Sequence, residues 1–148
     1  YETNSATRPI LQVTKKLLLN RYQKMMEIGV GINNLSADED IHELRIAFKK
    51  FRYLMELFPG VFPKKRLSGL IGKVKTVQTV LGDFNDYSTQ IYFLEEYIDD
   101  SRLEMSKSLC GLIAVLYQKQ TDEKKKVVAA LENFFTKKLS GEIDSLFG

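Results

Sequence analysis

The sequence predicts an all-α protein, an antiparallel bundle of four or more long helices. Apolar residues recur at spacings of three and four along the chain, and no segment sustains the alternation typical of a half-buried strand. The composition, 44% hydrophobic and 28% charged, is that of a folded globular protein and excludes wholesale disorder. A length of 148 residues fits one domain, which we expect to cover residues 1–148.

Two helices are expected in the first 60 residues. The first covers about residues 9–28 and ends at Gly29, because glycine commonly terminates helices. The second begins near residue 38, where Ser36 or Asp38 can cap the N–H groups that lack a partner in the first turn. It ends at Phe58, which precedes a Pro-Gly pair.

The rest of the chain predicts four further helices. They are expected at about residues 63–81, 83–97, 103–119 and 122–139. Gly82 ends the first of them, an aspartate or asparagine between residues 83 and 86 caps the second, and Thr121 caps the last. Residues 99–101 form a polar loop, and the last helix stops before Gly141.

Several functional classes are excluded by residue counts. A single cysteine, Cys110, cannot form an internal disulfide and fits a reducing compartment. One histidine and one cysteine do not supply the ligands of a zinc site, and we expect neither metal nor cofactor. No window approaches the roughly 18 apolar residues of a membrane span. Residues 1–9 lack the apolar core of a signal peptide. We therefore expect a cytoplasmic protein that does not enter a membrane.

Positive charge is concentrated in one part of the chain. The net charge is only +3, but residues 42–75 contain nine Lys and Arg against two acids. The remainder holds 13 basic and 17 acidic residues. Such an asymmetry indicates a polyanionic partner for the basic segment.

The second expected helix has an apolar face and a basic face. The apolar face, which we expect in the core, comprises Leu44, Ala47, Phe48, Phe51, Leu54, Met55 and Phe58. The opposite side carries His42, Arg45, Lys49, Arg52, Tyr53 and Glu56, with Lys50 adjacent. Like charges three and four residues apart destabilise a helix by roughly 0.2–0.5 kcal/mol per pair, and only Glu56 relieves this on that face.

Two interpretations of this face remain open. It is either a solvated surface, as on many helices, or an anion site. Arginine offers planar bidentate donors to phosphate oxygens, lysine a compact charge, protonated histidine two donors and tyrosine a hydroxyl. Spread over three turns, these groups suit an extended phosphate chain better than a single phosphate.

Further basic residues on neighbouring helices extend the candidate site. On the first helix, Arg21 and Lys24 fall within the apolar arc, where they either extend over hydrophobic surface or face a basic channel. On the third, Lys73 and Lys75 flank the apolar stripe. Gln78 lies within that stripe and is expected to hydrogen-bond a neighbour.

Two motifs in order resemble the CHAD domain, the conserved histidine α-helical domain. The first is His42-x-x-Arg45-x-x-x-Lys49-Lys50-x-Arg52-Tyr53-x-x-Glu56, and the second is Val77-Gln78-x-x-Leu81-Gly82-Asp83-x-Asn85-Asp86. The motif pair spans about residues 41–98 and resembles the second helical half of the family alone, because no earlier copy of the histidine motif occurs.

The resemblance implies a helical fold whose basic helices line a groove or pore that binds inorganic polyphosphate. Binding without catalysis is expected because the sequence has no glycine-rich phosphate loop and no acidic cluster on one helix face for Mg²⁺. It also implies association with polyphosphate granules and a partnership with a CYTH-type, triphosphate-processing domain. His42, Arg45, Lys49 and Arg52 match the basic motif, and Asp86 matches the acidic position after the Leu-Gly pair of the second motif. A chain that resembles one half is further expected to form a homodimer.

Three alternatives accompany these expectations. Asp86 is either a helix N-cap or a residue that orients Arg52 or Lys49. His42 could serve a phosphohydrolase or phosphotransferase as general acid or phosphate acceptor. The basic helix could instead bind nucleic acid, whose backbone presents similar charge.

Overall fold

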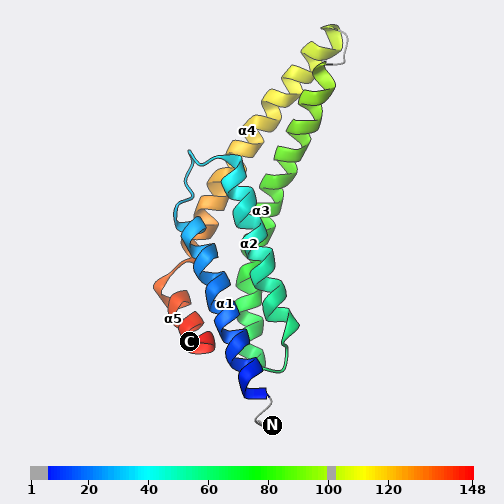
Figure 1. The fold of residues 1–148 in the computed structure, drawn as a ribbon. Coiled ribbons are helices and arrows are strands. Elements are labelled where there is room, and N and C mark those ends of the chain that lie inside the picture. Colours follow the sequence, from blue (N-terminus) through cyan, green and yellow to red (C-terminus); the bar gives the residue numbers. More distant parts are fainter. Residues whose placement is uncertain (1–6, 100–102) are drawn as a thin grey trace.

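A computed structural model describes residues 7–99 and 103–148, and these residues form five helices packed antiparallel (Figure 1). The predicted all-α fold is confirmed. The helices are α1 (Thr7–Val30), α2 (Asp38–Leu57), α3 (Lys64–Asp99), α4 (Leu103–Phe134) and α5 (Lys137–Phe147).

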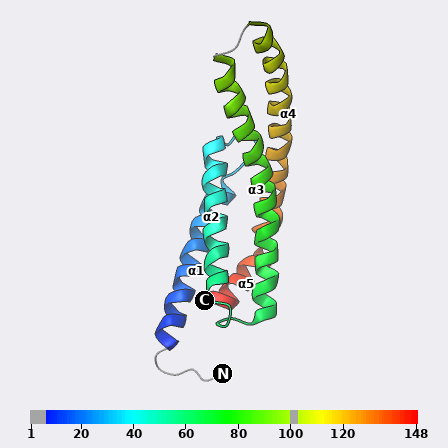
Figure 2. The same cartoon turned by 90° about the vertical axis from the view of Figure 1, so that its right-hand side faces the viewer.

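The helices divide the molecule into a bundle and a projecting hairpin. α1, α2 and the first half of α3 lie side by side, and α5 packs beside α1 in the part of the bundle away from the hairpin (Figures 1 and 2). α3 and α4 continue together well beyond the other helices, so their distal parts pack only on each other (Figures 1 and 2). α2 packs against α3 within the bundle, and this contact decides where the basic residues of α2 lie.

The core lies where the apolar stripes of the helices meet. On α2, Leu44, Phe48, Phe51 and Met55 are fully buried, as the sequence predicts. The stripe of α3 that faces them is also buried, and it comprises Leu67, Leu70, Val74, Val77 and Leu81. Aromatic rings in the core pack against one another at tilted and edge-on angles, the arrangements that aromatic pairs prefer. These rings belong to Tyr22, Phe48, Phe51, Phe134, Phe135 and Phe147.

The expected helix end at Gly82 is wrong. α3 runs without a break through Gly82 to Asp99, so no residue between 83 and 86 caps a new helix. A glycine inside a helix costs about 1 kcal/mol relative to alanine. The packing of α3 against α2 and then α4 outweighs that local penalty. Of the loop expected at residues 99–101, Asp99 is the last residue of α3, and residues 100 and 101 lie outside the described residues.

The expected boundary at Thr121 is also wrong. α4 is continuous from Leu103 to Phe134, and the Thr121 hydroxyl donates to the carbonyl of Tyr117 one turn earlier in the same helix. The chain instead breaks at Thr136, whose hydroxyl accepts a hydrogen bond from the Leu139 amide and caps α5. Gly141, expected to follow the last helix, lies within α5.

The ends of the first two helices differ from prediction in detail. Gly29 lies inside α1, where a close approach by the Phe135 ring leaves no room for a side chain. The N-cap of α2 is Ala37, which provides no side-chain hydrogen bond. Ser36 and Asp38 do not cap it because their side chains are engaged by Asn33 and by residues of α4. No helix among the described residues is long and apolar enough to cross a bilayer.

Candidate functional site

The basic residues of α2 lie beside α3, along a seam that we call the α2–α3 seam. Core residues on one face of α2 fix its rotation, because Leu44, Phe48 and Phe51 are buried. This rotation leaves Arg45, Lys49 and Arg52 at the edge of the core, and each is half-buried. The local sequence therefore folds so that burial of the apolar face places three cations along one edge.

Arg52 bridges the two helices of the seam. Its Nε donates to Oε1 of Glu56 one turn later at 2.8 Å, and its Nη1 donates to Oε1 of Gln78 on α3 at 3.0 Å. The guanidinium also lies 5.4 Å from the centre of the Tyr53 ring. These contacts hold Arg52 in one orientation, and the Gln78 amide nitrogen remains a donor because its oxygen accepts from Arg52.

A hollow of about 200 Å³ opens in the seam beyond Arg52, toward the start of α2. His42 and Arg45 line it from α2, and Asn85 and Ser88 line it from α3. Two carboxylates, Asp38 and Glu39, stand at the same hollow, so it is not purely basic. His42 itself is exposed. The arrangement offers imidazole, guanidinium, amide and hydroxyl donors around one small space.

Arg45 and Lys49 differ from Arg52 in having no partner among the side chains that the structure describes. Within residues 9–98 and 107–148, neither side chain forms an ion pair or a hydrogen bond. They are four residues apart on one helix, where like charges repel. Lys50 and Tyr53 are exposed further round the same helix. The seam thus carries positive charge that the described part of the protein does not neutralise.

The remaining predicted cations are divided between different surfaces. Lys75 is exposed on α3 one turn before Gln78, and Arg21 and Lys24 lie half-exposed and exposed on α1, which packs against α2. Lys73 lies apart, because its Nζ contacts both carboxylate oxygens of Glu142 on α5 at 3.2 Å. It borders a cavity of about 450 Å³ between α3, α4 and α5 instead of the seam.

Asp86 does not contact Arg52 or Lys49. The acceptors of Arg52 are Glu56 and Gln78, and Asp86 instead lines a hollow together with Asp83, Tyr87, Gln90 and Glu123. Asp86 is not a helix N-cap, because α3 is continuous at this position. It does not orient Arg52 or Lys49 either, because its side chain lies toward α4.

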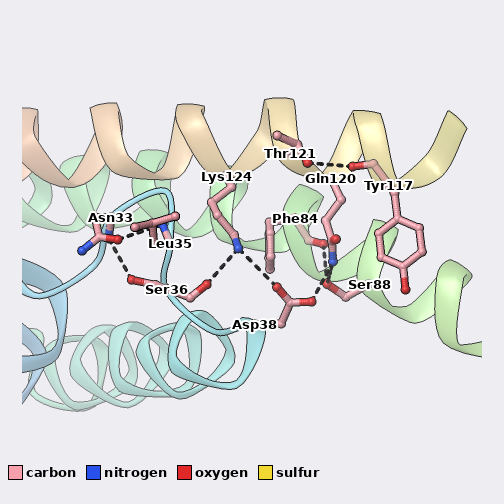
Figure 3. A network of polar contacts seen from close by, with 10 residues as sticks. All are labelled: Asn33, Leu35, Ser36, Asp38, Phe84, Ser88, Tyr117, Gln120, Thr121 and Lys124. Carbon is pink, nitrogen blue, oxygen red and sulfur yellow. Dashed lines mark hydrogen bonds and ion pairs between the residues drawn. The ribbon is translucent and has the colours of Figure 1, made fainter. Parts of the chain in front are cut away.

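A polar network between α2, α3 and α4 fixes the start of α2 at the seam (Figure 3). Nε2 of Gln120 donates to Asp38 at 3.0 Å and to the Ser88 hydroxyl at 2.8 Å. Nζ of Lys124 donates to the Ser36 carbonyl at 2.8 Å and lies 3.5 Å from the Asp38 carboxylate. Gln120 is only 7% exposed, whereas the side chain of Asp38 is 46% exposed, so the network lies where the core meets solvent and ties the start of α2 to α3 and α4.

Gln120 and Lys124 are residues that the sequence reasoning missed. Both lie in a segment where polar residues are frequent, and no local pattern distinguishes them from solvent-facing neighbours. Their partners are 32 to 88 residues away in the chain. They act on the seam indirectly, because they hold the first turn of α2 and hence His42 in place.

The chemistry available along the seam is that of anion binding. Its side chains are mainly hydrogen-bond donors with positive charge, and the one carboxylate paired within it, Glu56, leaves other cations uncompensated. Among the described residues, no group of three or more His, Cys, Asp or Glu side chains is arranged to hold a metal ion.

Comparison with family models identifies the fold. The model of the CHAD domain matches residues 2–95, more than half of the chain. The chain belongs to the CHAD family. The match covers α1, α2 and most of α3, the helices that form the seam, whereas α4 and α5 lie beyond it. A CHAD domain is typically a non-catalytic helical domain. Among curated proteins, no relative matches this CHAD domain.

Proposed function

We propose that this CHAD domain binds inorganic polyphosphate along the α2–α3 seam and does not catalyse its turnover. The observation that carries the proposal is the pair Arg45 and Lys49, both half-buried at the seam and without an ionic partner among the described residues. A polyanion would supply the missing countercharge and remove their mutual repulsion.

The dimensions of the seam favour an extended ligand over a single phosphate. His42 and Arg52 are ten residues apart on α2, and at 1.5 Å per residue this is about 15 Å. Arg45 and Lys49 lie between them, and Lys75 and the Gln78 amide contribute from α3. Donors repeated over that length match an anion with repeated charges, such as a chain of several phosphate units.

Arg52 has a different role from the two unpaired cations. Its guanidinium is held by Glu56 and Gln78 before any ligand binds, so it offers its remaining N–H donors in a fixed orientation. Preorganised donors cost little side-chain entropy on binding. The seam therefore combines one oriented donor group with two adjustable charges.

Titration of the purified chain with polyphosphate of defined length, followed by phosphate measurement in the presence of Mg²⁺, tests the proposal. We expect saturable binding and no release of phosphate. Release that is lost in the His42→Ala variant would instead support a phosphohydrolase. Equal displacement of polyphosphate by duplex DNA, compared at fixed salt and equal charge, would support nucleic-acid binding.

A further inference from the structure

Gly82 lies in the middle of the α2–α3 seam, on the α3 side. It follows Gln78 by four residues and precedes Asn85 by three, so these three positions share one side of the continuous helix α3. Gln78 accepts the hydrogen bond from Arg52, and Asn85 lines the hollow together with Arg45. Between these two polar side chains, α3 presents only its backbone to the seam.

Lys49 lies on α2 at the level of Gly82. α2 and α3 run antiparallel, and the hydrogen bond between Arg52 and Gln78 marks one level on both helices (Figure 1). At about 1.5 Å per residue, Lys49 lies about 4.5 Å from Arg52 along α2, and Gly82 lies about 6 Å from Gln78 in the same direction along α3. The half-buried Lys49, without a partner among the described side chains, is therefore placed across the seam from a residue that has no side chain.

The space in front of Gly82 is open, although the residue itself is half-buried. A Cβ added there would meet no described atom within 4 Å outside its own stretch of helix. Gly29 differs, because a Cβ at that position would collide with the ring of Phe135. Alanine at position 82 would cause no clash and would favour the helix, since glycine loses more backbone entropy on folding. Packing of the described helices therefore does not require a glycine at this position.

We propose that Gly82 shapes the polyphosphate site, because the absence of a side chain keeps the seam open in front of Lys49. One phosphate unit then lies between α3 and the ammonium group of Lys49, while neighbouring units reach Arg52 and Arg45. A larger residue at position 82 would fill this space without removing any charge from the seam. The inference rests on the proposed function, and it assigns the gap in α3 to the ligand and not to helix packing.

The variant Gly82→Leu tests the inference, because leucine favours a helix, carries no charge and extends into the open space. We expect it to melt no lower than the parent and to bind polyphosphate about tenfold more weakly, which corresponds to the loss of one charge-assisted contact. Gly82→Ala should melt about 1–4 °C higher than the parent and bind with intermediate affinity.

The matched control is Gly69→Leu, which makes the same change at another open position of α3. Gly69 is exposed and lies nine residues before Gln78, or two and a half turns, and therefore on the opposite side of the helix. This variant should bind polyphosphate as the parent does.

A double-mutant cycle with Lys49→Gln tests which contact Gly82 permits. If Gly82→Leu acts by keeping phosphate away from Lys49, it should weaken binding little further in a chain that already carries Lys49→Gln. Fully additive effects of the two changes would show that Gly82 and Lys49 act independently, and would overturn the inference.

Titration and thermal melts of the parent and variants separate the possible failures. Absence of saturable polyphosphate binding by the parent would overturn the proposed function and this inference with it. Binding by the parent that Gly82→Leu leaves unchanged would overturn the role of Gly82 alone. A melting temperature of Gly82→Ala clearly below that of the parent would show that helix packing requires the glycine, and would also overturn the inference.

Discussion

The guanidinium of Arg52 on α2 donates a hydrogen bond of 3.0 Å to the side-chain oxygen of Gln78 on α3. This bond joins residues 26 positions apart and spans the seam between two helices. It fixes the arginine and leaves the amide nitrogen of Gln78 as a donor facing the same seam. The contact makes Gln78 a positioning residue in the proposed polyphosphate site.

Replacement of Gln78 by leucine should weaken polyphosphate binding by about two- to tenfold, the equivalent of one net hydrogen bond. Arg52 would keep Glu56 but lose the acceptor that aims it across the seam. Isothermal titration of Gln78→Leu against the exposed control Thr79→Val measures the effect. Unchanged affinity in Gln78→Leu would remove Gln78 from the site.

The three cations on α2 should differ in their effect on stability. The double change Arg45→Gln and Lys49→Gln removes repulsion of roughly 0.2–0.5 kcal/mol, so its melting temperature should equal or exceed that of the parent at low salt. Arg52→Gln should melt lower, because it loses an ion pair with Glu56 and a bond to Gln78. Thermal melts without ligand decide this, and a double variant that melts clearly lower would contradict the absence of a structural partner.

Gly29 is expected to be intolerant of any side chain. A Cβ added there would lie 2.3 Å from Cε2 of Phe135, whose ring packs on Tyr22, Phe48 and Phe134. Gly29→Ala should therefore destabilise the protein by about 1–3 kcal/mol through overpacking. The matched control is Gly69→Ala, an exposed helical position with no atom within 4 Å, which should be stabilised by about 0.5–1 kcal/mol. Chemical denaturation measures both, and equal effects would refute the packing argument.

Polyphosphate affinity should fall steeply as salt concentration rises. If several cations each replace counterions of the polyanion, the logarithm of the affinity declines linearly with the logarithm of salt concentration. Lys49→Gln should reduce that slope by about one contact. An affinity independent of salt would indicate recognition of a small, shape-selected ligand.

The periodicity of apolar residues was sufficient to predict the helical fold and the core face of α2. Leu44, Phe48, Phe51 and Met55 are buried as expected because a hydrophobic stripe must face the core whatever its partner is. Helix ends were less predictable. Gly82 and Thr121 have the local chemistry of boundaries, yet long-range packing of α3 on α4 carries the helices through both positions.

Periodicity within one helix also predicted part of the candidate site. It placed His42, Arg45, Lys49 and Arg52 on one side of α2, because the side that a residue occupies depends only on the helical period. Periodicity does not predict contacts between different helices. The pairing of Lys73 with Glu142 depends on where α5 packs, and the role of Gln120 depends on the approach of α2 to α4. Neither approach is encoded by spacing within a helix.

The affinity of the Arg45→Gln, Lys49→Gln double variant for polyphosphate tests the central claim most directly. Its matched control is Lys125→Gln with Lys138→Gln, which removes the same charge from exposed positions on α4 and α5. We expect the seam variant to bind at least about tenfold more weakly, because two charge-assisted contacts are lost, and the control to bind nearly as the parent does. Equal weakening in both variants would show that net charge alone attracts the polyanion, and would contradict a binding site at the α2–α3 seam.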